Sequence, residues 1–167
     1  MRLALFLSLL AASFGALAHP GDHAGGFAHG FAHPFAGLDH LLAMLAVGLW
    51  AARFSGRPRW ILPLAFVSFM ALGTGLVLPM VEPMIVLSVL VLGLGAAMGS
   101  RLPLAAGAAV TALFALYHGQ AHFAEIPAEA SAAGFVLGML SATALLHAAG
   151  LLVALQALRA RARLLVS

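Results

Sequence analysis

The chain contains no cysteine and very few charged residues, and both absences narrow what it can be. Without cysteine there are no disulfide bonds and no thiolate ligands, so a bound metal would need imidazole, carboxylate, thioether or backbone groups. Only 8% of the 167 residues are charged and 63% are hydrophobic, which excludes an ordinary soluble domain. The few basic residues are all arginines beside apolar stretches, so a nucleic-acid surface is not expected. Composition therefore predicts a single-domain, all-α integral membrane protein.

The first eighteen residues have the pattern of a secretory signal peptide. Arg2 precedes an apolar run over residues 3–10, and small residues follow up to Ala16–Ala18, which form an A-x-A cleavage site. The alternative is a retained first transmembrane helix, for which the apolar stretch is short. Cleavage after Ala18 would leave a mature chain that begins at His19, outside the cytoplasm.

Five later stretches are long and apolar enough to cross about 30 Å of hydrocarbon as helices. They are residues 35–52, 60–79, 83–100, 102–122 and 131–158. We therefore predict a signal peptide at 1–18, a histidine-rich periplasmic tail at 19–34 and a bundle of five transmembrane helices within 35–167.

The charged residues of the mature chain separate into two groups along this pattern. The arginines follow the first, third and fifth predicted helices: Arg53, Arg57, Arg59, Arg101, Arg159, Arg161 and Arg163. Apart from Asp39, the acidic residues fall on the opposite side: Asp22, Glu82, Glu125 and Glu129. By the positive-inside rule the arginine side is cytoplasmic, so we expect a periplasmic N-terminus and a cytoplasmic C-terminus in the inner membrane of a bacterium.

Two histidine-bearing strings lie within these apolar stretches, where ionisable groups are rare and usually functional. The first is HPFAGLDHLLAM, from His33 to Met44. If a helix follows the proline directly, a rotation of about 100° per residue puts His33, His40 and Met44 on one stripe. Asp39 lies beside that stripe, where it could bind a metal or orient the imidazole of His40. The alternatives are a purely structural Asp–His pair and a packing role for Met44.

The second string is YHGQAHFAE, from Tyr117 to Glu125. His118 and His122 are four residues apart and Glu125 follows three later, so a continuous helix would align all three on one face. Two imidazoles and a carboxylate at this spacing are typical of a transition-metal site. Because Pro127 ends the helix, this group should lie near the outer boundary of the membrane.

The remaining histidines give weaker signals. His147 is alone in the fifth predicted helix, where a packing histidine with its hydrogen bonds satisfied is at least as good an interpretation as a ligand. In the tail, His19 and His23 could capture a metal, although such tails also occur without function. We therefore treat His19, His23 and Met44 as auxiliary metal ligands.

Together the two strings resemble the signatures of the HupE/UreJ family of small nickel and cobalt permeases. The first is similar to the family pattern HPxxGxDHxxxM, and the second to FHGxAHGxE. Carried over onto this chain, the metal-site positions of the family are His33, Asp39, His40, His118, His122 and Glu125. The resemblance implies nickel or cobalt uptake, often in support of hydrogenase or urease maturation. The chain departs from the second pattern at Tyr117, where Phe is usual, and at Phe123, where a Gly is replaced by a bulkier side chain between His122 and Glu125.

We therefore expect a nickel or cobalt uptake permease rather than an enzyme, with the ion as substrate and no permanently bound cofactor. The sequence has no phosphate-binding P-loop motif, so intrinsic ATP hydrolysis is not expected. The main alternative is an intramembrane zinc-dependent hydrolase assisted by Ser68 or Ser141, and a second is a haem-binding subunit with histidines on facing helices. Imidazole and carboxylate suit nickel, cobalt and zinc alike, so the choice of nickel rests on the resemblance.

Overall fold

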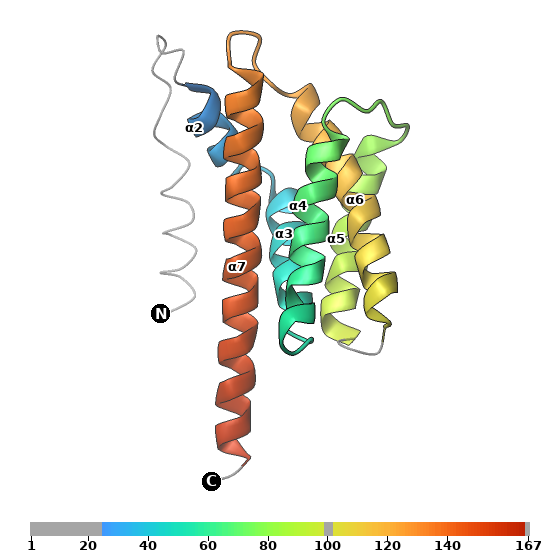
Figure 1. Cartoon of the computed structure of the whole chain (residues 1–167), viewed down its shortest axis with the longest axis vertical. Coiled ribbons are helices and arrows are strands. Elements are labelled where there is room, and N and C mark those ends of the chain that lie inside the picture. The colour runs from blue at the N-terminus through green and yellow to red at the C-terminus, as the bar shows by residue number, and fades with distance from the viewer. Residues whose placement is uncertain (1–24, 99–101, 166–167) are drawn as a thin grey trace.

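The computed structural model describes residues 25–98 and 102–165, and the regular elements within these ranges are all helical (Figure 1). The α-helices are α2 (Gly25–Ala32), α3 (Leu38–Ala51), α4 (Ile61–Gly73), α5 (Val81–Met98), α6 (Leu104–Ala124) and α7 (Ala132–Leu164). Two short 3-10 helices, η1 (His33–Phe35) and η2 (Arg57–Trp60), precede α3 and α4. The all-α prediction is confirmed for these residues, whereas the predicted signal peptide at 1–18, His19 and His23 lie outside them.

Helices α3 to α7 each overlap one of the five predicted spans, but they differ in how well they suit a membrane. Within the described residues, α5 and α7 are individually long and apolar enough to cross a bilayer. The segment Gly26–Phe35 and α3 together would make a third span, bent by 81°. Helix α4 has only 13 residues, or about 20 Å, which is short for a membrane span. Helix α6 has 21 residues but contains the polar residues of the second string. The structure thus contains two or three candidate membrane spans by length and composition.

The first predicted helix is interrupted rather than continuous. The chain leaves α2 through η1, passes Gly37 with an extended backbone (φ −97°, ψ 119°), and only then begins α3 at Leu38. Glycine is a poor helix former, so an extended conformation at this position carries little cost. The assumption of one helix running directly from Pro34 is therefore wrong, and His33 and His40 do not share a helical stripe.

Helix α2 packs against the first turns of α7 through glycines on both helices (Figure 1). A Cβ atom at Gly30 would collide with the backbone of Phe135, and one at Gly138 would collide with the backbone of Phe27. Only residues without a side chain allow this close approach. The contact fixes α2, and with it the following His33, at the end of the bundle where the segment between α6 and α7 lies.

The side chain of Trp50, near the C-terminal end of α3, is 1% exposed and fills the interior between α5 and α6. Its indole lies where Gly95 of α5 and Gly107 of α6 leave room, since a Cβ atom there would approach the ring to 2.6 Å and 3.1 Å. Helix α3 packs against both α5 and α7, and α4 packs against α6. These contacts hold the helices that carry the two histidine strings in one bundle.

The outer surface of this bundle is apolar. Leucines of α4, α5 and α7 are more than half exposed, among them Leu64, Leu72, Leu90, Leu137 and Leu152. A soluble protein rarely exposes so many large apolar side chains, whereas a lipid-facing surface requires them. The packing therefore agrees with the membrane class predicted from composition.

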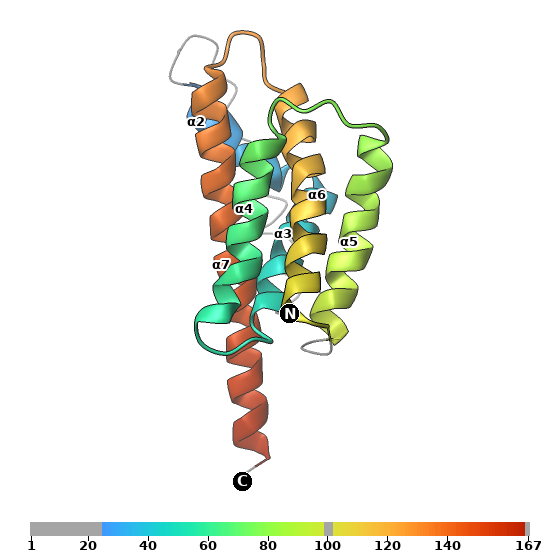
Figure 2. The same ribbon diagram turned by 45° about the vertical axis from the view of Figure 1, so that its right-hand side comes forward.

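The segments that join the helices alternate between the two ends of the bundle (Figures 1 and 2). Segments 74–80 and 125–131 lie at one end, and η2 lies at the other, toward which the C-terminal half of α7 extends well beyond its neighbours. With 33 residues, α7 is about 50 Å long. The basic residues of η2 and of the last turns of α7 are thus separated from the acidic residues of the opposite segments.

Candidate metal centre

Three imidazoles from two helices meet inside the bundle. His40 of α3 contacts His118 and His122 of α6, with ring centroids 4.9 Å and 4.3 Å away. Each ring offers one nitrogen, and these three nitrogens lie within 4.8 Å of one another. Nitrogens that bind one ion at about 2.0–2.1 Å lie about 3.4 Å from one another in tetrahedral geometry, so the three rings would draw closer together to bind one ion. We call this group the three-histidine cluster.

Each imidazole of the three-histidine cluster has at least one buried ring nitrogen without a hydrogen-bond partner in the described part of the chain. His118 and His122 are both 0% exposed. Nε2 of His40, Nδ1 of His118 and both ring nitrogens of His122 have no hydrogen-bond partner in the described part of the chain. Most buried polar atoms in proteins do have a partner, so a converging set without one is the pattern of a ligand site.

Asp39 orients the first imidazole of the cluster. Its Oδ1 accepts hydrogen bonds of 2.8 Å from both the backbone N–H and Nδ1 of His40. Because a carboxylate only accepts, Nδ1 carries the proton and Nε2 keeps its lone pair for the cluster. A Cβ atom at Gly37 would lie 2.9 Å from this oxygen, which explains the glycine in the first string. Among the described residues, Asp39 belongs to neither group of converging donor atoms, and its contact is to His40.

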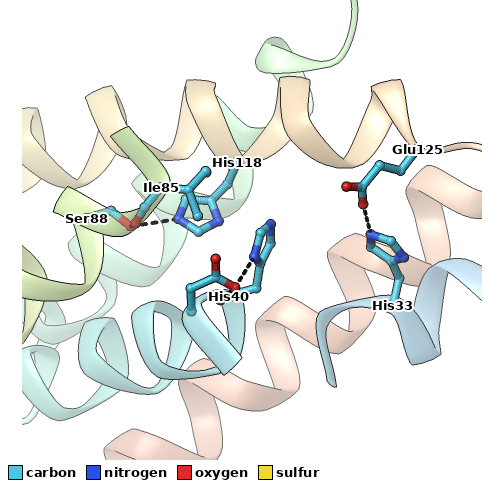
Figure 3. Close-up of polar contacts among 7 residues, drawn as sticks. His33, His40, Ile85, Ser88, His118 and Glu125 are labelled. Carbon is cyan, nitrogen blue, oxygen red and sulfur yellow. Dashed lines mark hydrogen bonds and ion pairs between the residues drawn. The ribbon is translucent and has the colours of Figure 1, made fainter. Parts of the chain in front are cut away.

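Ser88 orients the second imidazole, and the sequence analysis missed it. Its hydroxyl donates to the carbonyl of Ile85 at 2.6 Å and lies 2.9 Å from Nε2 of His118 (Figure 3). A hydroxyl has one hydrogen, so Ser88 accepts from the N–H of His118, whose Nδ1 is left with the free lone pair. The available signal was a hydroxyl within α5, whose other residues after Glu82 are all apolar or small.

A second group links the three-histidine cluster to the surface. His33, His122 and Glu125 also bring their donor atoms within 4.8 Å, and Nε2 of His33 lies 2.6 Å from Oε2 of Glu125. The side chain of Glu125 is 55% exposed, while that of His33 is 26% exposed. We call these residues the entrance group. Because His122 belongs to both groups, the two form a continuous row of ligands from the surface to the interior.

Gly119, between the two histidines of α6, serves helix packing. A Cβ atom at Gly119 would collide with the backbone of Met70, so this glycine lets α4 and α6 approach closely. Phe123, in contrast, is 41% exposed, whereas the preceding His122 is buried. Successive helical side chains point about 100° apart, so Phe123 is directed away from the buried His122.

Two further candidates lie one turn or more beyond the cluster. Met44 is fully buried, and its Sδ accepts a hydrogen bond of 3.4 Å from Oγ1 of Thr143. His147 is 2% exposed, and neither of its ring nitrogens has a hydrogen-bond partner among the described residues. The interpretation of His147 as a packing histidine with satisfied hydrogen bonds is therefore wrong.

The arrangement gives no support to the two alternative functions. Ser68 and Ser141, which a hydrolase would need beside the metal, are both exposed, and Ser141 donates to the carbonyl of Leu137 in its own helix. The imidazoles of the cluster are in edge-to-face contact, which leaves no gap for a porphyrin between them. The chemistry that the site supports is the binding of a bare metal ion.

Comparison with known proteins identifies the family of the chain. The family model described as HupE / UreJ protein matches residues 7–167. Protein HupE of Rhizobium leguminosarum bv. viciae is 44% identical over 155 residues, which cover 90% of this chain and 81% of that protein. No solved structure matches the chain. Both histidine strings lie within a match over nearly the whole length, and the chain belongs to the HupE/UreJ family.

Proposed function

We propose that this protein is an uptake permease for a divalent transition metal, nickel or cobalt, in the bacterial cytoplasmic membrane. The observation that carries the proposal is the three-histidine cluster, in which buried, unpartnered nitrogens of His40, His118 and His122 converge. Family membership supports transport rather than catalysis. The choice of nickel over zinc rests on the family resemblance, since the donor set suits both. Hydrogenase or urease maturation would be the downstream use of the ion.

The proposed membrane arrangement has five spans, formed by α3 to α7. The arginine-rich end, with η2 and the C-terminal turns of α7, faces the cytoplasm, as the positive-inside rule requires. The mature chain would begin at His19 on the periplasmic side, after removal of the signal peptide. The tilt of α7 and the extension of the short α4 by η2 would adapt their lengths to the bilayer.

In this arrangement the ion enters at the entrance group. Glu125 is the most exposed ligand and carries a negative charge that attracts a dication. His122 then passes the ion from the entrance group to the three-histidine cluster, because it is the one ligand that both groups share. Such a row of nearby sites lets an ion exchange ligands in steps instead of losing all of them at once.

Asp39 supplies the charge that makes a dication tolerable at this depth. Its carboxylate is hydrogen-bonded to His40 and therefore acts on the ion through that imidazole. Burying an uncompensated charge costs a large free energy, which a neutral donor offsets less well than a carboxylate does. An inside-negative potential would favour inward movement by about 2.3 kcal/mol per charge for each 100 mV, so no ATPase is required.

The proposal is tested by uptake of radioactive nickel into sealed liposomes that contain the purified full chain under an inside-negative potential. We expect His118→Ala and His122→Ala to reduce uptake by about tenfold or more, the effect typical of losing a metal-site group. His29→Ala is the matched control, since it removes an exposed imidazole of α2. Wild-type uptake no faster than in empty liposomes, or equal uptake by all three variants, would overturn the proposal.

A further inference from the structure

The buried His147 lies beyond the ligands used so far. It is 15 residues into α7, about 22 Å from the start of that helix, whereas His122 is two residues from the end of α6. A Cβ atom at Gly48 would collide with the carbonyl oxygen of His147. His147 therefore lies beside the C-terminal half of α3, about two helical turns from His40. With both ring nitrogens buried and unpartnered among the described residues, its imidazole is free to bind a ligand.

Two thioether sulfurs lie beside the same face of α7. Oγ1 of Thr143 is 3.4 Å from Sδ of Met44 and 3.6 Å from Sδ of Met70. Thr143 precedes His147 by one helical turn, so both side chains lie on the same face of α7. The sulfurs come from α3 and α4, and both methionines are 0% exposed. Thr143 thus links the two thioethers of α3 and α4 to the face of α7 that carries His147.

The ring of Phe66 lies between His147 and His118 of the three-histidine cluster. Its centroid is 5.4 Å from that of His118 on one side and 5.1 Å from that of His147 on the other. Phe66 is itself fully buried and lies one turn from Met70 on α4. An ion leaving the three-histidine cluster toward the opposite end of the bundle would therefore meet first this aromatic ring and then His147.

We propose that His147, with the sulfurs of Met44 and Met70, forms a second, inner binding position for the transported metal ion. The inference rests on the proposed function. Thioethers are softer and weaker donors for a divalent ion than imidazole or carboxylate, so this position binds the ion less tightly than the three-histidine cluster. Weak binding suits a position from which the ion must leave toward the cytoplasm. Phe66 is the barrier between His118 and His147, and displacement of its ring connects them.

The inner position is tested by nickel binding and by X-ray absorption of the purified full chain. We expect two ions at saturation in the wild type and one in His147→Leu, with the affinity of the tighter site unchanged and uptake about tenfold lower. The absorption spectrum of the doubly loaded wild type should contain a sulfur contribution that the paired change Met44→Leu and Met70→Leu removes. Met98→Leu is the matched control, since it deletes an exposed thioether of α5.

The outcomes separate this inference from the proposed function. Normal uptake by a wild type that binds only one ion, or a spectrum without sulfur, would overturn the inner position and leave the permease standing. Two bound ions, one with sulfur ligands, in a protein that takes up no nickel would overturn the permease and leave the inner position. If His147→Leu fails to fold, the spectra of the wild type and the methionine variants decide the question.

Discussion

Replacing Ser88 with alanine should weaken metal binding without unfolding the protein. In the wild type the Ser88 hydroxyl accepts a hydrogen bond of 2.9 Å from the protonated Nε2 of His118, which leaves Nδ1 free for the ion. Alanine removes this acceptor, so the buried N–H is left unpaired or the proton moves to Nδ1, where it blocks the ligand. An unpaired buried donor costs about 1–3 kcal/mol. Loss of the hydrogen-bond partner of a metal ligand usually lowers metal affinity by about 10–100-fold. This fold-change corresponds to a free energy of the same size as the cost of the unpaired donor.

The measurement is calorimetric titration of nickel into the purified full chain, with Ser141→Ala as the matched control. Ser141 loses the same hydroxyl, but that hydroxyl donates to the carbonyl of Leu137 on an exposed face of α7. We expect an affinity at least about tenfold lower for Ser88→Ala and an unchanged affinity for Ser141→Ala, with similar thermal unfolding of both. Equal affinities in the two variants would refute the reasoning that Ser88 fixes the proton position of His118.

Three further predictions concern the carboxylate and the membrane arrangement. Asp39→Asn should lower nickel uptake at least about tenfold at matched protein levels, and Asp39→Glu should retain part of it; normal uptake by the asparagine variant would make Asp39 purely structural. The intact mass of protein from its native membrane should correspond to a chain that begins at His19, and a mass that includes residues 1–18 would reject cleavage. Reporters inserted near Ala128 and fused after Ser167 should be periplasmic and cytoplasmic, respectively, and the reverse pattern would overturn the orientation.

The helices and most of the candidate ligands could be predicted from the sequence for simple physical reasons. Long apolar stretches predict helices, and each of the five predicted stretches overlaps one of α3 to α7. Ionisable residues are costly in such stretches, so His40, His118 and His122 stood out as functional, and they meet in the structure. The i, i+4 spacing also correctly placed His118 and His122 on one buried face of α6.

The break at Gly37 could not be predicted from the same patterns. Helical periodicity treats the first string as one continuous helix, although the extended backbone at Gly37 separates His33 from α3. His33 still reaches the site because α2 docks on α7, a contact between segments about a hundred residues apart in sequence. Its neighbour is accordingly His122 of another helix, with ring centroids 4.8 Å apart, and not a residue on its own stripe.

Contacts that depend on the rotation of an apolar helix about its axis could not be predicted from the sequence either. Helix α5 is apolar on nearly every side, so its sequence does not indicate which face turns inward. The role of Ser88 follows only once that rotation is known. The same holds for His147, since its position opposite Phe66 depends on how α7 packs against α3 and α4.

The central claim is that the transported ion binds between His40, His118 and His122. Anomalous X-ray diffraction at the nickel absorption edge, from crystals of the full chain grown with nickel, tests it most directly. The account predicts a strong anomalous peak within bonding distance, about 2.0–2.1 Å, of Nε2 of His40 and Nδ1 of His118, with His122 as the third ligand. Nickel found only at the protein surface, with the three imidazoles in the interior making no contact to it, would contradict the account.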